Sequence, residues 1–499
     1  MIQSKWMRKP VGFVLFFCLT MGCTILTGRG AAQVPSTQVP LTAASAPTAL
    51  PSVSPAVQLP TIPAASPVPT KPAAPASLNA HGPYILFKGQ GGIWITNPDG
   101  GFATRISAYD VQGDLRHAIS PAGDKMALVV STEQGLDLVL VTIPSGETET
   151  ITHLIRISPE EKANAVSAKS FVLYAIRDYD SVAWQPGRGD LLAFIGAMKG
   201  PSADLYLYDT HSKEIKQLTN GPSQAVLPAW SPDGKYILHF GVSWVQPLGG
   251  AIGNANQLDG AWSVQVSDGK VITLPKPVST YPTFVGWQDA SHFLIYDVDE
   301  TCSRNTLRSV DVPSGKSAAL MKKSFYTGIA LSPQNGALLF SGNDAAGCPN
   351  ALGDGVYLLL PGQTTPTKLL DKIAYEGRWL PESGVFLAYP EALISADGST
   401  RYEPPVYEAS YNPAVSTKGY QAWEVIQNQQ GRAMVRIPGG EWQKVMDGMV
   451  KQLIWDSATG ETLLIALEDG SLYAASFPDF TPRLVGNLGG VVDQAIWLP

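Results

Sequence analysis

Apolar and polar positions alternate in short runs along most of the chain after residue 80, and turn residues separate the runs. The clearest case is the stretch 227–240, LPAWSPDGKYILHF. An apolar run ends at Trp230, Ser231–Gly234 has the composition of a tight turn, and Tyr236–Phe240 resumes an alternating pattern. Proline fixes φ at the second position of such a turn, and glycine accepts a positive φ at its end. The pattern predicts two antiparallel strands joined by this turn.

Weaker copies of this strand–turn–strand unit recur from His117 to the end of the chain. A tryptophan recurs at the same point of the unit, at Trp184, Trp230, Trp287, Trp379, Trp455 and Trp497. One copy cannot bury its own apolar face, whereas stacked copies can, and a period of about 40–50 residues is typical of a β-propeller. We therefore expect these tryptophans to pack between neighbouring blades.

The two ends of the repeat region complement each other. Strands are predicted at 84–87, 92–96 and 104–106, but the first strand of that unit is missing before them. The missing strand is predicted at the other end of the chain, over Asp493–Leu498. A C-terminal strand that completes the N-terminal sheet closes a propeller ring and removes its exposed edges.

The number of blades follows from the strands that open each unit. We count nine such strands in the sequence, including the C-terminal one. Two of them, at Trp379 and Tyr411, are close enough in sequence to belong to one irregular blade. The predicted fold is therefore all-β, a single propeller of four-stranded blades, with eight blades favoured in a range of seven to nine.

Parts of two successive units resemble the TolB-like propeller repeat, which is found in many bacterial exported proteins. Trp230–Lys235 (WSPDGK) matches the turn motif of that repeat. Asp204–Asp209 (DLYLYD) and Gln217–Thr219 (QLT) match the rest of the unit. The resemblance extends roughly from Pro83 to Pro499 and implies a propeller fold. It implies little about activity, because propellers carry unrelated functions.

The N-terminus has the composition of an export signal. Basic residues between Lys5 and Lys9 precede an apolar run, Val11–Met21, and Cys23 follows. This arrangement resembles a bacterial lipoprotein signal, in which the lipidated cysteine, here Cys23, becomes the first mature residue. Ordinary cleavage near Ala31 and an uncleaved membrane anchor are the alternatives. All three place the rest of the chain outside the cytoplasm. The first predicts a membrane-anchored lipoprotein, periplasmic or on the outer cell surface.

A linker is predicted between the signal and the propeller. Residues 31–80 consist almost wholly of Pro, Ala, Ser, Thr, Val, Leu and Gln, with Lys71 as the single charge. Such a stretch cannot offset its ordering entropy by burial, and its prolines favour an extended conformation. The predicted organisation is a signal peptide at 1–23, a linker at 24–80 and a TolB-like propeller at 81–499.

Long insertions point to one face of the propeller as the binding face. They fall at 155–180, 241–261, 298–305 and 341–355, in links between blades or between second and third strands. Both kinds of link lie on the same face of a propeller, and function concentrates in loops that a rigid scaffold holds. The expected ligand-binding residues lie in the first two insertions and are Tyr174, Arg177, Asp178, Tyr179, Trp244, Asn254, Asn256 and Asp259.

The first two insertions differ in character. Ser158–Glu161 predicts a helix start with a capping box, and the helix is expected to run towards Tyr174. Arg177–Asp180 are expected near the mouth of the central channel. The insertion at 241–261 predicts a flexible, glycine-rich loop. Its amide and aromatic groups suit a sugar or peptide ligand, and they suit packing within the loop equally well.

Two cysteines remain outside the signal. Cys302 and Cys348 fall in the same loop of two successive blades, and adjacent blades bring such loops together. In an oxidising compartment this placement predicts a disulfide between them, with two separate thiols as the alternative. No histidine or second cysteine pair lies near them in sequence, so we expect no metal site.

The sequence shows no catalytic constellation. It has no HExxH, no GxSxG, no phosphate-binding loop and no dinucleotide fingerprint. A net charge of −7 and the absence of a basic run after the signal argue against a nucleic-acid partner. We therefore expect a non-catalytic, membrane-tethered binding or scaffold propeller at the cell envelope, without cofactors. Its expected partners are a protein, a peptide or a glycan, and the membrane through the lipid anchor.

The alternative is an enzyme that processes glycans or peptides with acidic residues at the channel mouth. Paired carboxylates with separated pKa values at the mouth would favour the enzyme. A mouth lined by aromatic and amide groups would favour the binding protein.

Overall fold

The computed structural model describes most of the chain after residue 77. The described residues are 78–498 except 90, 101–102, 110–113, 164–167, 178–179, 248–253, 278–282, 298–304, 324–326, 343–347, 349–350, 373–375, 381–383 and 390–391. By its internal contacts the chain divides into two units, Met1–Ala74 and Pro75–Pro499. The predicted signal peptide with Cys23, and nearly all of the predicted linker, lie outside the described residues.

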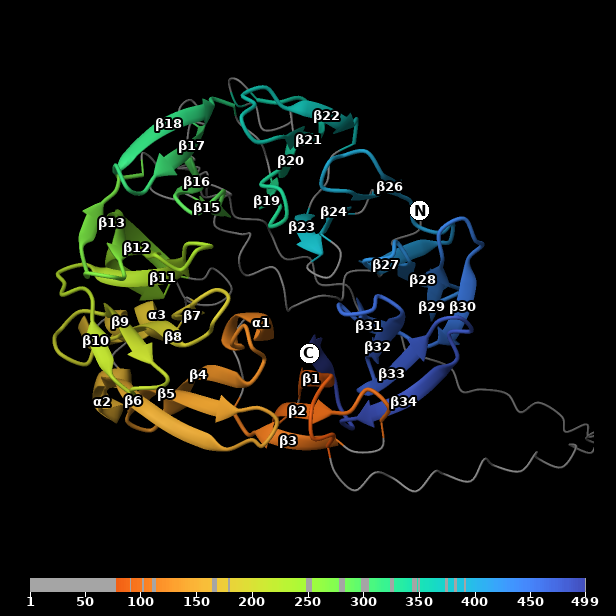
Figure 1. Ribbon diagram of the computed structural model, residues 1–499, viewed down its shortest axis with the longest axis horizontal. Coiled ribbons are helices and arrows are strands. Elements are labelled where there is room, and N and C mark those ends of the chain that lie inside the picture. The colour runs from red at the N-terminus through yellow and green to blue at the C-terminus, as the bar shows by residue number, and fades with distance from the viewer. Residues whose placement is uncertain are drawn as a thin grey trace, which may run out of the picture. The chain divides into compact units, whose positions relative to one another are not determined.

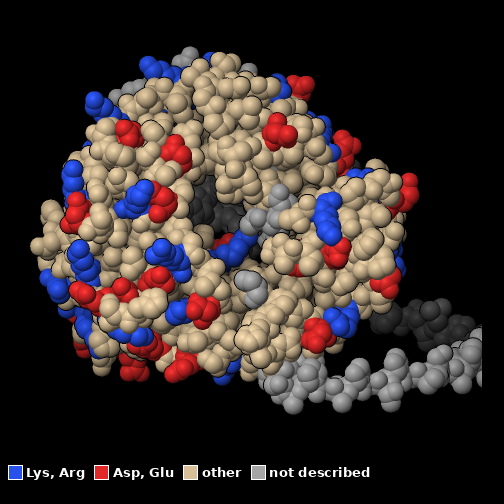
Figure 2. Space-filling model, viewed as in Figure 1, with Lys and Arg blue, Asp and Glu red and all other residues tan. Residues whose placement is uncertain are grey.

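The second unit is a ring of antiparallel sheets, as Figure 1 shows. Eight sheets have four strands and one has three. Figure 2 shows a hollow at the centre of the ring, with acidic and basic side chains intermixed on the face around it. The predicted all-β propeller of four-stranded blades is confirmed.

The first part of the ring contains three sheets. The sheet that holds both ends of the ring comprises β1 (Tyr84–Gly89), β2 (Gly92–Thr96), β3 (Ala103–Ser107) and β35 (Val492–Leu498). The three-stranded sheet comprises β4 (Lys125–Thr132), β5 (Gly135–Thr142) and β6 (Thr148–Arg156). The next comprises β7 (Val182–Trp184), β8 (Leu191–Gly196), β9 (Asp204–Asp209) and β10 (Ile215–Gln217).

Three more sheets follow in the same pattern. They comprise β11 (Gln224–Trp230), β12 (Tyr236–Pro247), β13 (Asn254–Gln265) and β14 (Val271–Thr273); β15 (Thr283–Trp287), β16 (His292–Asp297), β17 (Thr306–Asp311) and β18 (Lys316–Met321); and β19 (Thr327–Leu331), β20 (Leu338–Gly342), β21 (Gly355–Leu359) and β22 (Thr367–Leu370).

The last three sheets complete the ring. They comprise β23 (Glu376–Leu380), β24 (Val385–Tyr389), β25 (Ala392–Ile394) and β26 (Arg401–Tyr402); β27 (Ala409–Val415), β28 (Gln421–Gln427), β29 (Gln430–Arg436) and β30 (Gln443–Asp447); and β31 (Val450–Trp455), β32 (Thr462–Leu467), β33 (Ser471–Ser476) and β34 (Pro482–Asn487).

The C-terminal strand closes the ring as predicted. β35 pairs antiparallel with β1, with Tyr84 opposite Leu498 and Phe87 opposite Ala495. The sheet order is β3-β2-β1-β35, so the last strand of the chain takes the inner position that the N-terminal segment leaves empty. Closure removes the two sheet edges that an open ring would expose.

The structure corrects the assignment of two opening strands. Trp379 lies in β23 and Tyr411 in β27, which belong to different four-stranded sheets rather than to one irregular blade. The opener predicted at Ala118 is instead a short helix, α1 (Leu115–Ala118), followed by a single bridge between Ile119 and Met126. That replacement leaves the β4–β6 sheet with three strands, whereas the other eight sheets in the described part of the ring have four.

The recurring tryptophans join neighbouring blades. Trp230 Nε1 donates a hydrogen bond of 2.8 Å to the carbonyl oxygen of Ala183 on the inner strand of the preceding sheet. Trp184 makes the same 2.8 Å contact with the carbonyl of Ala118. Apolar side chains from successive sheets form continuous buried clusters around them. The expected packing of these tryptophans between blades is confirmed, and each buried aromatic contributes about 1.5–3 kcal/mol relative to exposure.

The turn after Trp230 has the predicted geometry. Gly234 N donates to the carbonyl of Ser231 at 2.9 Å, and Ser231 Oγ donates to Asp233 Oδ1 at 2.8 Å. Gly234 has a φ of +70°, which a side chain rarely accepts. The turn residues therefore fix the register of β11 on β12.

The first insertion is helical and the second is a hairpin. α2 (Pro159–Ala163) begins at the predicted capping box, since Ser158 N donates to Glu161 Oε2 at 2.9 Å and Glu161 N donates to Ser158 Oγ at 3.2 Å. α3 (Ala168–Arg177) follows and packs on β11 and β12. The loop expected at 241–261 is wrong for most of its length, because β12 and β13 continue as paired strands to Pro247 and from Asn254.

None of the helices in the described part of the chain combines the length and the apolar character that crossing a bilayer requires.

Candidate functional site

Two places in the described ring bring polar side chains together in a way that suggests function. The first is a charged cluster around α1. This helix contacts β7 and β35, which are the inner strands of their sheets, and it also contacts β4. Figure 1 shows α1 beside the centre of the ring. α1 itself therefore lies near the centre of the ring.

Asp114 fixes the start of α1. Its carboxylate accepts from Arg116 N at 2.9 Å and pairs with the Arg116 guanidinium at 2.6 Å. Gln494 on β35 donates to Asp114 Oδ1 at 2.6 Å and accepts from Leu115 N at 2.7 Å. Burial raises the pKa of Asp114, but the hydrogen bond and charge of Arg116 outweigh it and hold this pKa well below its usual range. Asp114 is therefore an ionised anchor of the helix.

His117 pairs with Asp180, the residue two positions before β7. The distance from His117 Nδ1 to Asp180 Oδ2 is 3.3 Å, and the two side chains are 61% and 55% exposed. The hydrogen bond to Asp180 raises the pKa of His117 above 6.5. An exposed imidazole that a carboxylate orients can exchange protons near neutral pH. The pair can therefore act as an acid–base group towards a molecule in the hollow.

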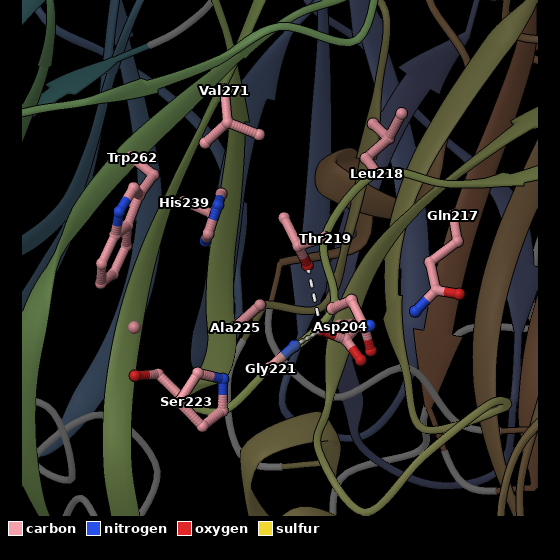
Figure 3. Close-up of a pocket in the computed structure, with 13 residues that line it drawn as sticks. Asp204, Gln217, Leu218, Thr219, Gly221, Ser223, Ala225, His239, Trp262 and Val271 are labelled. Carbon is pink, nitrogen blue, oxygen red and sulfur yellow. Dashed lines mark hydrogen bonds between the residues drawn. The ribbon is translucent and has the colours of Figure 1, made fainter.

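The second place is a cavity of about 600 Å³ between the β7–β10 and β11–β14 sheets. Figure 3 shows His239 and Trp262 on one side of it, and Asp204 and Gln217 on the other. Asn220–Ser223, in the link from β10 to β11, also line it. This volume is within the range of small-molecule binding sites.

The indole of Trp262 is held by two glycines. Gly241 and Gly260 face each other across β12 and β13, next to the pair formed by His239 and Trp262. A Cβ on Gly241 would lie 2.5 Å from the Trp262 ring, and one on Gly260 would lie 2.8 Å from it. The ring can therefore lie over this part of the hairpin only because both positions are glycine. It also stacks on the imidazole of His239, with ring centres 5.7 Å apart.

His239 is buried and neutral. Its side chain lines the cavity, and burial lowers its pKa to about 4. Nδ1 lies 3.4 Å from the carbonyl oxygen of Phe240, which can only accept, so Nδ1 carries the proton. Nε2 then presents a lone pair, and no group in the described chain donates to it.

The opposite wall is built from the residues that resemble the TolB-like repeat. Asp204 is buried and accepts from Gly221 N at 2.7 Å and from Thr219 Oγ1 at 3.1 Å, as the dashed lines in Figure 3 show. These bonds hold the link between β10 and β11 in place. Next to them, Gln217 Nε2 is a buried donor without a partner among the described residues.

The predicted ligand-binding residues that the structure describes are not among those that line this cavity. Tyr174 and Arg177 are on α3, where the Arg177 guanidinium is 4.9 Å from the centre of the Tyr174 ring. Asp259 accepts a hydrogen bond from Ser223, which lines the cavity. Asp178 and Tyr179 are outside the described residues, as are the side chains of Trp244, Asn254 and Asn256. That these residues bind a ligand stays a prediction.

The predicted disulfide is described from one side only. Cys348 is disulfide-bonded, and its predicted partner Cys302 lies outside the described residues, so the pairing stays a prediction. Across the described residues, no three His, Cys, Asp or Glu side chains form a group that could hold a metal ion.

Sequence reasoning missed both polar groups. His117 was assigned to the start of a repeat unit, because Ile119–Pro121 has the composition of an opening strand. The capping residue Asp114, followed by Arg116, was the signal for a helix at this point. The sequence places His239 in a predicted strand and gives no signal at Trp262, since only the pairing of β12 with β13 brings the two together.

Comparison with known proteins gives one curated relative with a short match. No protein-family model matches the chain. A segment of 55 residues is 44% identical to the uncharacterized peptidase YuxL of Bacillus subtilis (strain 168). The segment is 11% of this chain and 8% of the peptidase, so the match spans a small part of either protein.

Solved propeller structures resemble the chain at low identity. They include dipeptidyl peptidase 4 of Porphyromonas gingivalis, with a TM-score of 0.42 and 11% identity over 76% of this chain and 62% of that chain. An oligogalacturonate lyase in complex with manganese has a TM-score of 0.32 and 15% identity over 60% and 74%. TolB of Acinetobacter baumannii has a TM-score of 0.27 and 13% identity over 75% and 82%. The match spans less than two thirds of the dipeptidyl peptidase. This likeness concerns the fold.

The comparisons contradict two expectations from the sequence. We expected a non-catalytic binding or scaffold propeller, and no enzyme. The curated protein that matches a short segment of the chain is a peptidase by its description. On this finding both expectations are wrong, and the alternative of an enzyme that processes glycans or peptides is the one that remains. Sequence motifs could not separate the two, because no motif marks the acid–base pair beside α1.

Proposed function

We propose that this chain is an enzyme that cleaves peptides or glycans, with His117 and Asp180 as its acid–base pair. The single observation that carries the proposal is their contact of 3.3 Å, made by a residue of α1, the helix that lies near the centre of the ring. A group that titrates near neutral pH and is open to solvent is suited to proton transfer. The neighbouring Asp114 is held ionised by Arg116 and anchors the helix that carries His117.

The pair suits a hydrolytic step. The imidazole of His117 would accept a proton from a water molecule as its oxygen attacks the scissile carbon. It would return that proton to the leaving nitrogen or oxygen as the substrate bond breaks. Asp180 would orient the ring and stabilise the imidazolium that forms in between. A segment of 55 residues that is 44% identical to a Bacillus subtilis peptidase supports peptide cleavage, and the cavity lined by Trp262 supports glycan binding.

The test is the kinetics of His117→Gln and Asp180→Asn in the full chain. Each substitution keeps the side-chain size and removes acid–base capacity, so kcat is expected to fall by about 10²–10⁴-fold with little change in KM. Asp180→Asn should also move the acidic limb of the pH–rate profile to lower pH, because the carboxylate that raises the pKa of His117 is gone.

A matched control lies on the outer strand of the three-stranded sheet. His153 pairs with Asp137 at 2.8 Å, with the same atom types as the proposed pair. His153→Gln should leave kcat at the wild-type value. Unchanged kcat in His117→Gln, or equal losses in both histidine variants, would contradict the proposal.

We also propose that the enzyme is exported and tethered through Cys23. The signal-like segment supports this location. Cells grown with radiolabelled palmitate should incorporate label into the wild-type chain and not into Cys23→Ala. Equal labelling of the two chains would exclude lipidation at this residue.

A further inference from the structure

We propose that the cavity between the β7–β10 and β11–β14 sheets binds a ring of a neutral saccharide against Trp262. This inference rests on the proposed function and names a substrate class for it. The cavity lies between two blades, and its walls come from both, so the rigid ring of sheets fixes their spacing.

An aromatic side chain, Trp262, forms part of the cavity wall. Trp262 is half-buried, lines the cavity and crosses the hairpin over Gly241 and Gly260. Its ring is also stacked on His239, so it has one defined orientation. A large, fixed aromatic surface offers apolar contact to the C–H face of a sugar ring without the entropy of ordering a mobile side chain.

Two buried polar atoms on residues that line the cavity have no hydrogen-bond partner among the described residues. His239 Nε2 is buried and presents a lone pair, while Gln217 Nε2 is a buried donor, and neither has a partner in the described chain. Leaving such groups unpaired is costly. A hydroxyl both donates and accepts, so a sugar hydroxyl has the chemistry to pair with an atom of either kind. A proline ring has the same flat shape but offers no N–H to His239.

The described residues that line the cavity carry little charge. Asp204 is the one ionisable group besides His239 among the described residues that line the cavity, and no lysine or arginine is among them. The Asp204 carboxylate is already held by Thr219 and Gly221. An acidic sugar would bring a second carboxylate into a partly buried site without a cation to pair with it. A neutral ring carries no such penalty.

The experiment is isothermal titration calorimetry on the full chain with five probes. Three are neutral: cellotetraose, maltotetraose and N,N′,N″,N‴-tetraacetylchitotetraose. Trigalacturonate tests the acidic class, and tetraproline tests a flat peptide ring. We expect at least one neutral probe to bind, and Trp262→Ala to weaken that binding at least tenfold. Trp442→Ala is the control, since this half-buried tryptophan lies near the distant β27–β30 sheet against Arg436.

A second variant keeps the test decisive if Trp262→Ala does not fold. Gln217→Leu keeps a similar volume and removes only the unpaired donor, so it should weaken binding about threefold to tenfold. Wild-type affinity in Trp262→Ala and Gln217→Leu would overturn the inference. Binding of trigalacturonate or tetraproline alone, or of no probe, would also overturn it.

The outcomes of this experiment and of the kinetic test are independent. Binding that depends on Trp262, without any cleavage in the kinetic assay, would retain the saccharide site and remove the proposed function. Cleavage that depends on His117, together with binding that ignores Trp262, would retain the function and remove this site.

Discussion

His239 illustrates what a single side chain contributes to this fold. It lies on β12 with 5% of its surface exposed, between the hydrophobic core and the inter-blade cavity. A polar residue at such a position normally finds a partner, and here Nε2 has none among the described residues. The fold therefore carries a cost at this position, which a hydroxyl group of a bound molecule would remove.

The low pKa of His239 has a consequence for stability in acid. Burial lowers this pKa from 6.5 to about 4, so the unfolded chain binds a proton at a higher pH than the folded chain does. Stability is therefore retained above pH 6.5 and is lost as the pH falls towards 4, by on the order of 3 kcal/mol.

Urea unfolding at several pH values measures this effect. His239→Gln cannot titrate, so its free energy of unfolding should fall less between pH 6.5 and 4 than that of the wild type. The comparison uses the slope with pH, because the substitution also changes packing against Trp262. Parallel pH profiles for the two proteins would show that His239 is not the titrating group.

At the scale of elements, the strand–turn–strand unit was predictable from the sequence, because its signals are local. The turn at Ser231–Gly234 and the capping box at Ser158–Glu161 both form as expected. α1 was missed although Asp114 gives it a local capping signal, and its contact with Gln494 on β35, far away in the sequence, was not predictable. The β12–β13 hairpin was also missed, because its glycines suggest a loop. In the structure, Gly241 and Gly260 leave the space that the Trp262 ring occupies.

The tryptophans that join blades differ in one measurable respect. Trp230 Nε1 donates to the Ala183 carbonyl at 2.8 Å, whereas Trp287 Nε1 is buried without a partner in the described chain. Replacing either residue by phenylalanine removes a similar volume. Trp230→Phe should therefore lower the free energy of unfolding by about 1–2 kcal/mol more than Trp287→Phe does. Chemical denaturation of the two variants checks this, and equal losses would show that the inter-blade hydrogen bond contributes little.

At the scale of the whole molecule, ring closure and the proposed acid–base pair are connected. β35 closes the ring on β1, and its residue Gln494 also holds the start of α1, next to His117. The ring was predictable because both chain ends carry incomplete units. The site was not, because His117 pairs with Asp180 across a gap of more than 60 residues, and Gln494 reaches Asp114 only after closure.

The proposed activity of this propeller is the cleavage of peptides or glycans by His117, on α1, and Asp180. The most direct measurement is mass-spectrometric product analysis of a mixed library of peptides and oligosaccharides after incubation with the full wild-type chain, His117→Gln or His153→Gln. We expect new fragments with the wild type and with His153→Gln. With His117→Gln we expect at least 99% of these fragments to be lost, because removing an acid–base group lowers the rate roughly 100-fold. An unchanged library with the wild type, or the same fragments from all three proteins, would contradict it.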